Sequence, residues 1–225
     1  MSRKRIRLSP VRIIALGFLA MILIGAGLLV LPVSSRSREG LGFFDALFTA
    51  TSACCVTGLI VVDTWTQFSL FGQVVLLVLI QIGGLGFMSV AALFSLALGK
   101  RIGLRERSLL MESVSSLHIG GVVLLLRRVL IGTAVFEGAG AVLLALRFCP
   151  RLGLARGLWY GVFHSVSAFC NAGFDLMGRF EPFSSLTQFR GDVYVNVIIM
   201  LLILLGGIGF VVWQDVLVNK LHFSR

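Results

Sequence analysis

Two segments of matching sequence carry the residues that could bind a cation. Residues 52–59 read SACCVTGL and residues 167–174 read SAFCNAGF, so serine, alanine, cysteine and glycine recur at an offset of 115 positions. Glycine accepts backbone angles that other residues avoid, so Gly58 and Gly173 allow the carbonyls beside them to point toward one axis. Backbone carbonyls arranged in this way can replace the hydration shell of a potassium ion.

We predict that the backbone carbonyls of both segments line an ion filter. The first filter comprises Val56, Thr57, Gly58 and Leu59, and the second comprises Asn171, Ala172, Gly173 and Phe174. Non-helical backbone at membrane depth must be buried or must face a cavity that holds water or ions, and a filter meets that requirement. The alternative is that both are ordinary loop glycines, which two matched copies disfavour.

The flanking sequences repeat as well. Apolar stretches at 43–51 and 158–166 precede the segments and are too short to cross a bilayer, but long enough for re-entrant half-helices. Long apolar runs follow, each with a glycine cluster: GGLGF at 83–87 and GGIGF at 206–210. A unit of helix, half-helix, glycine loop and helix therefore occurs twice.

The composition requires a membrane. Hydrophobic residues make up 57% of the 225 residues, charged residues 13%, and the mean hydropathy is +0.99. Spanning runs are expected at 11–31, 70–98, 129–146 and 193–212. We predict an all-α integral membrane protein of two tandem helix–pore loop–helix units, with four transmembrane helices and two re-entrant pore helices.

The charge distribution predicts the topology. Most of the 20 Lys and Arg lie near the N-terminus, in the basic connection and near the C-terminus. The positive-inside rule then places both termini in the cytoplasm of a multi-pass cell-membrane protein. The predicted parts are a first unit (1–98), a cytoplasmic connection (99–120), a second unit (121–218) and a cytoplasmic end (219–225). The net charge of +10 therefore reflects topology. The lipid bilayer is an expected partner, and no nucleic-acid partner is expected.

Acidic residues outside the filters are candidates for supporting roles. Asp63 and Asp175 follow the filters on the predicted outer side, where they would raise the local cation concentration. Glu137 lies within a predicted helix, where a carboxyl group often marks function. It could relay an ion or proton, or it could brace a filter by hydrogen bonding to loop backbone, and we favour the bracing role.

No catalytic or resident metal site is predicted. His164 beside Ser165 suggests a serine hydrolase, but adjacent helical residues point in different directions and no acid is placed to orient the histidine. We expect His164 to pack behind the second half-helix. The chain is therefore not expected to be an enzyme, and the metal ion expected is transported K+.

The segments TSACCVTGLIVVDTW and SAFCNAGFDLMG, followed by QIGGLGF and LLGGIGF, resemble the first two pore units of the Trk/Ktr/HKT potassium transporters. The stretch GKRIGLRERSLLMES is most similar to the membrane subunit of Ktr-type systems. This resemblance implies four units in one polypeptide, with filter glycine for potassium and serine for sodium. It also implies control by a cytoplasmic nucleotide-binding ring, with the nucleotide (ATP/ADP or NAD) on that partner and no cofactor in this chain.

Two units supply two of four filter loops, which leaves half of an ion's shell unfilled. The expected function is potassium uptake after assembly with a second copy or a separate second half. The alternative is a non-conducting truncated fragment, or an assembly or modulatory subunit of a full-length transporter. The sequence leaves open the choice between K+ and Na+, coupling to Na+ or H+, the gate and the oligomeric state.

Overall fold

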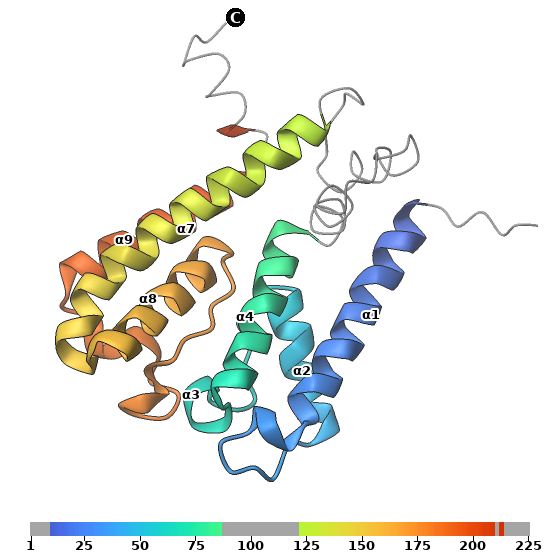
Figure 1. Cartoon of the computed structure of the whole chain (residues 1–225), viewed down its shortest axis with the longest axis horizontal. Coiled ribbons are helices and arrows are strands. Elements are labelled where there is room, and N and C mark those ends of the chain that lie inside the picture. Colours follow the sequence, from blue (N-terminus) through green and yellow to red (C-terminus); the bar gives the residue numbers. More distant parts are fainter. Residues whose placement is uncertain (1–9, 87–121, 210–211, 214–225) are drawn as a thin grey trace, which may run out of the picture.

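The computed structural model describes residues 10–86, 122–209 and 212–213, and it is helical, with no strand among those residues. An isolated antiparallel bridge joins Ser35 to Phe68. The all-α prediction is confirmed for the described part of the chain. The helices form two groups side by side, α1 to α4 in blue to green and α7 to α9 in yellow to red (Figure 1).

The two groups share the order of their three main helices and differ in the short helices between them. The first contains α1 (Pro10–Val30), the 3-10 helix η1 (Pro32–Ser34), α2 (Phe43–Cys54), α3 (Thr64–Gln67) and α4 (Leu70–Leu85). The second contains α7 (Val122–Leu152), α8 (Leu154–Phe169), the 3-10 helices η2 (Met177–Arg179) and η3 (Ser185–Phe189), and α9 (Val193–Gly207). In each group a long helix is followed by a shorter one and then by another apolar helix.

The shorter helices lie where the sequence predicts them, with longer bounds. The structure extends the 43–51 prediction to α2 with 12 residues, and the 158–166 prediction to α8 with 16 residues. At about 1.5 Å per residue these helices are roughly 18 and 24 Å long, less than the hydrocarbon core. Helix α8 starts early because Gly153, at φ +84°, separates it directly from α7.

Two apolar runs contain helix ends that hydropathy does not detect. Helix α4 ends at Leu85, before Gly86 with φ +80°, and α9 ends at Gly207, shortly before Gly209 with φ +87°. The rest of the predicted 70–98 span, the 99–120 connection and the 219–225 end lie outside the described residues. By contrast, the helix that contains the predicted 129–146 span, α7, is longer than predicted.

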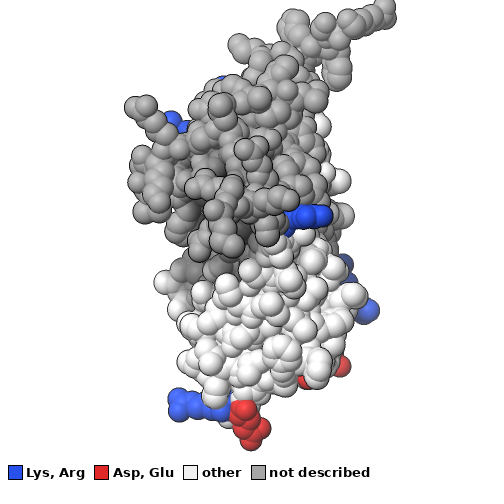
Figure 2. Space-filling model, turned by 90° about the vertical axis from the view of Figure 1, so that its right-hand side faces the viewer, with Lys and Arg blue, Asp and Glu red and all other residues white. Residues whose placement is uncertain are grey.

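Among the described residues, α1 over Arg12–Val30 and α7 over Arg127–Leu152 are long and apolar enough to cross a bilayer. Only 22% and 28% of those windows are buried within the chain, so most of their apolar surface faces outward. Figure 2, which views the molecule from the right-hand side of Figure 1, shows a described surface free of charge over most of its area, with charged side chains at its margins. That distribution suits lipid or further protein as the surroundings.

The two groups are joined by packing of α4 against α8 and by polar contacts at one end of the molecule. The Trp159 indole N–H donates to the side-chain oxygen of Gln73 at 2.8 Å. The Phe183 N–H donates to the Asp63 carboxylate at 3.0 Å. The rings of Trp65 and Tyr160 also meet, with centroids 5.5 Å apart.

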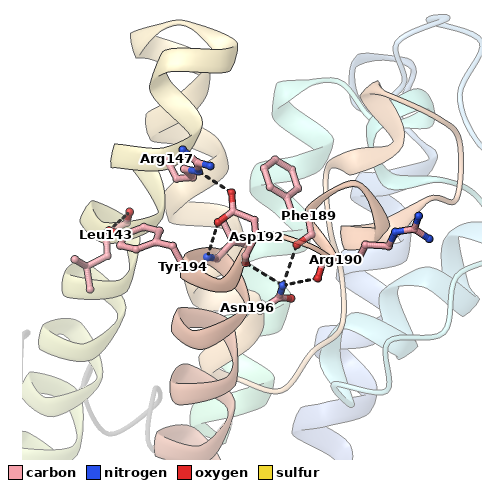
Figure 3. A network of polar contacts seen from close by, with 8 residues as sticks. Leu143, Arg147, Phe189, Arg190, Asp192, Tyr194 and Asn196 are labelled. Carbon is pink, nitrogen blue, oxygen red and sulfur yellow. Dashed lines mark hydrogen bonds and ion pairs between the residues drawn. The ribbon is translucent and has the colours of Figure 1, made fainter.

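The start of α9 is held against α7 by a second polar network (Figure 3). Asp192 caps α9 by accepting from the Val195 N–H, and its carboxylate pairs with Arg147 at 2.6 Å. The hydrogen bond from Arg147 lowers the pKa of Asp192 below its usual value. Asn196 donates to the carbonyls of Phe189 and Asp192, which fixes the approach to the helix.

Candidate functional site

The segment after α2 leaves the helix through a tight hydrogen-bonded turn. The Val56 N–H donates to the Ala53 carbonyl and the Thr57 N–H donates to the Ser52 carbonyl at 3.0 Å. This pair of bonds is the Schellman arrangement, in which the residue after the cap takes a positive φ, usually as glycine. Here that residue is Val56 with φ +50°, an unfavourable conformation for a β-branched side chain.

The segment after α8 repeats this turn bond for bond. The Asn171 N–H donates to the Ala168 carbonyl at 3.0 Å, and the Ala172 N–H donates to the Ser167 carbonyl at 2.8 Å. Asn171 has φ +56°, and Gly58 and Gly173 both have φ +73°. Positive φ thus occurs at the first and third filter positions of both segments.

The two predicted filter segments meet at their glycines. A Cβ atom built on Gly58 would lie 3.0 Å from the Ala172 carbonyl oxygen and 3.3 Å from the Gly173 Cα, and one built on Gly173 would lie 3.1 Å from the Gly58 Cα. Glycine is therefore required twice over, by the backbone angle and by the close approach.

A matched glycine in the following helix backs each segment. A Cβ on Gly83 of α4 would overlap the Cys54 carbonyl oxygen, and a Cβ on Gly206 of α9 would overlap the Phe169 carbonyl oxygen. Each glycine therefore lets the following helix lie directly against the end of the preceding short helix.

Glu137 of α7 lies behind the second segment, half-buried between the two groups of helices. Its carboxylate accepts from the Gln81 amide of α4 at 3.0 Å and from the Cys170 thiol at 3.7 Å. Cys170 caps α8 and immediately precedes Asn171. This carboxylate thus accepts from two side chains, whereas the bracing prediction had assumed a hydrogen bond to loop backbone.

The chain matches a known family along almost all of its length. The family described as TrkH, cation transport protein, matches residues 10–224. The chain belongs to this family. Its membership confirms the resemblance noted from the filter segments and supports a location in the membrane.

Three curated relatives are named as uptake proteins for potassium, or for potassium and sodium. The chain is 46% identical to the potassium/sodium uptake protein NtpJ of Enterococcus hirae, over 96% of this chain and 47% of that protein. It is 46% identical to the Ktr system potassium uptake protein B of Bacillus subtilis, over 96% and 47% respectively. Identity to the Ktr system potassium uptake protein B of Vibrio alginolyticus is 42%, over 91% and 44%. The chain spans about half the length of the curated relatives it matches.

The predicted outer acids have different surroundings in this member of the TrkH family. Asp63 is 5% exposed, and its carboxylate oxygens accept from the backbone N–H groups of Thr66 and Phe183. It therefore joins the segments that follow the short helices α2 and α8 in the two units. Asp175 is half-buried and accepts from the Met177 N–H at 2.8 Å. The proposed attraction of cations by either residue stays a prediction.

Further support for the filter segments comes from side chains whose role the sequence did not indicate. Ser52 shares a hydrogen bond of 2.7 Å with Thr57, and its repeat counterpart Ser167 donates to the Phe174 carbonyl at 2.6 Å. These bonds fix Thr57 and Phe174, two of the predicted filter residues, to the ends of α2 and α8. The recurrence of serine at the first position of both segments was the available signal.

His164 is fully enclosed behind the second segment, as expected for a packing residue. Its Nε2 accepts from the Leu176 N–H at 3.2 Å, so its Nδ1 must donate to the Tyr160 carbonyl at 2.7 Å. The neighbouring Ser165 hydroxyl donates to the Glu137 carbonyl. None of these hydrogen bonds joins His164 to Ser165.

Proposed function

We propose that this chain takes part in potassium uptake by supplying two of the four carbonyl-lined filter loops of a selective pore. The loops are residues 56–59 and 171–174, each carried by a re-entrant pore helix, α2 or α8. The two tandem units would then each contribute a helix, a pore loop and a helix to the membrane.

The contact between Gly58 and Gly173 is the observation that carries this proposal. Positive φ at alternate residues turns successive peptide groups so that like atoms face one side, which is how irregular backbone forms concave ion sites. Two such segments meet at matched residues of a 115-residue repeat. A potassium filter needs several loops with this geometry around one axis.

Two loops enclose only part of an ion. Thr57, Leu59, Asn171 and Gly173 remain exposed, which leaves a side of the filter segments open for further loops. A second copy of the chain or a separate second half would complete the pore.

The residues around the filter take supporting roles in this proposal. Glu137 braces the second loop through Cys170 and couples it to α4 through Gln81. Asp175 contributes negative potential at the outer mouth, and Asp63 does so while holding the two outer segments together.

The inner side would meet a regulatory partner. The ends of α4 and α9 and the starts of α1 and α7 lie at the end of the molecule opposite α3 (Figure 1). We assign that end to the cytoplasm, where the basic connection would contact a nucleotide-binding ring that carries ATP, ADP or NAD. The 99–120 connection itself lies outside the described residues.

A second candidate is a non-conducting fragment or a modulatory subunit. The observation that favours it is that the two predicted filter loops enclose only part of an ion and leave Thr57 and Asn171 exposed. Measured ion flux separates this candidate from the first.

Rubidium uptake in a bacterium that lacks potassium importers tests the proposal. The chain is expressed alone, and also together with the part of a relative that this chain does not cover. We expect uptake in at least one arrangement, with Gly58→Ser and Gly173→Ser reducing it or admitting sodium.

Gly27→Ser is the matched control, since nothing lies within 4 Å of a Cβ at this position. Uptake that is absent in both arrangements, despite membrane insertion, would support the non-conducting candidate. Uptake that both filter substitutions leave unchanged would contradict the assignment of the filter.

A further inference from the structure

A cavity separate from the filter segments opens between the two units at the end of the molecule that carries η1 and α3. Its volume is about 980 Å³. The first unit contributes Arg36, Trp65 and the start of α4, and the second contributes the start of α8, with Arg156 and Trp159. Both walls belong to this chain, so the cavity exists without a second half.

Cationic groups concentrate around this cavity. Arg36, Arg38 and Arg156 line it, and the Arg36 guanidinium lies 3.8 Å from the centre of the Trp65 ring. Arg179 approaches the same ring at 5.6 Å. Burial lowers the pKa of Arg36, and repulsion from Arg179 and Arg156 adds to the effect.

The carboxylate that acts on Arg36 is already engaged elsewhere. Among the groups that shift the pKa of Arg36, Asp63 has the weakest effect, which is to raise it. Both carboxylate oxygens of Asp63 accept hydrogen bonds from backbone N–H groups. The Arg36 Nε–H donates to the backbone carbonyls of Trp65 and Phe68, which carry no net charge, so the positive potential of the cavity is left for an external anion.

One polar group in the cavity wall has no partner. Tyr160 is completely buried, and its hydroxyl makes no hydrogen bond. Buried hydroxyls nearly always find a partner, so an unpaired one in the wall of a cavity indicates a ligand atom that can accept its proton. Such an acceptor would also suit the neighbouring guanidinium groups.

Besides the polar residues Ser35, Ser69 and Gln73, the rest of the wall is apolar. Val33 and Leu70 are 57% and 62% exposed, and the Trp159 indole stands beside them in the lining. An inorganic anion would leave this apolar part of the cavity unfilled. A ligand with a charged head and a hydrocarbon tail would cover both parts.

We propose that this cavity binds an anionic phospholipid, with its phosphate among Arg36, Arg156 and Tyr160 and an acyl chain along Val33 and Leu70. The lipid would link the two units at the side away from the contact between the filter glycines. The proposal does not depend on whether the chain conducts.

Quenching of tryptophan fluorescence by brominated lipid tests the site. The chain has three tryptophans, so Trp213→Phe leaves Trp65 and Trp159, both in the cavity wall, as reporters. The protein is placed in phosphatidylcholine nanodiscs with small fractions of phosphatidylglycerol or phosphatidylcholine brominated on the acyl chain. We expect half-maximal quenching at about tenfold lower fraction for phosphatidylglycerol, since charge-assisted hydrogen bonds distinguish the headgroups.

Variants assign the preference to the cavity. Tyr160→Phe removes a hydroxyl without a partner and therefore keeps the fold, and Arg156→Gln removes the charge of an exposed side chain. Each should reduce the preference severalfold, whereas Arg190→Gln, an exposed arginine outside the lining, should not.

Three results would overturn the proposal. They are equal quenching by both lipids, a preference that Tyr160→Phe and Arg156→Gln leave intact, and loss of the preference on adding inorganic phosphate, which would indicate a site for the free anion.

Discussion

Replacing Gly58 by alanine tests the contact between the two filter segments, and the structure sets the size of the effect. A non-glycine residue at φ +73° costs about 1–2 kcal/mol. The added Cβ would also lie 3.0 Å from the Ala172 carbonyl oxygen and 3.3 Å from the Gly173 Cα, both backbone atoms. Forcing backbone apart in a packed site costs a further ~1–3 kcal/mol. We therefore expect Gly58→Ala to lower the free energy of unfolding by roughly 2–5 kcal/mol.

Two other glycines separate these contributions. Gly153 has φ +84° and ψ 160° but nothing within 4 Å of its Cβ position, so Gly153→Ala should show the cost of a positive φ without a close contact. Gly27, within α1, has neither a positive φ nor a close neighbour, so Gly27→Ala should stabilise the helix by about 0.5–1 kcal/mol. Reversible unfolding in mixed micelles, followed by circular dichroism, measures all three on one scale.

The order of the three variants decides the outcome. Gly58→Ala must be the most destabilised, Gly153→Ala intermediate and Gly27→Ala neutral or stabilised. Equal losses for Gly58→Ala and Gly153→Ala would refute the close contact between the segments. The same variants in the rubidium uptake assay then show whether loss of the contact also impairs transport.

Further predictions concern the supports of the site. Val56→Asn, which copies Asn171 in the second unit, should raise the free energy of unfolding by about 1 kcal/mol, since asparagine tolerates positive φ better than valine; an unchanged value would argue against strain at this position. The lowered pKa of Asp192 means that the folded protein binds fewer protons than the unfolded one, so its contribution is complete above pH ~4 and declines as the pH falls through the folded value. Thermal stability of Arg147→Gln should therefore depend less on pH below about 4 than that of the parent chain, in which the two side chains pair (Figure 3). Asp63→Asn replaces one of two oxygens that accept backbone N–H groups by an amide, and should cost ~1–3 kcal/mol in unfolding free energy; no loss would show that these bonds are dispensable.

The repeat in the sequence predicted much of the local structure. Residues that match at an offset of 115 positions form matching turns. Val56 and its counterpart Asn171 both have positive φ, and so do Gly58 and its counterpart Gly173. This part was predictable because a helix end and its turn are set by a few consecutive residues.

Contacts between the two units could not be predicted from the sequence. Nothing in a periodic pattern indicates that Gly58 faces Gly173, or that Asp63 accepts from the Phe183 N–H across 120 positions. Hydropathy also placed helix ends poorly at α4 and α9, since a positive φ at Gly86 or Gly209 breaks a helix without changing its apolar character.

The supports seen here hold the filter segments from behind. Each segment is tied to its own short helix by two backbone bonds and a serine, and the matched glycine of the next helix lets that helix pack directly on the same helix end. A strained residue such as Val56 persists only where its surroundings over-determine its conformation. The backbone shape is therefore set before any ion arrives, so an ion exchanging water for carbonyls would not have to order the loop as well. Because their supports all lie on one side, the two segments can present their other side to the further loops of the proposed pore. In the described part of this chain, the exposed Thr57 and Asn171 lie on that open side.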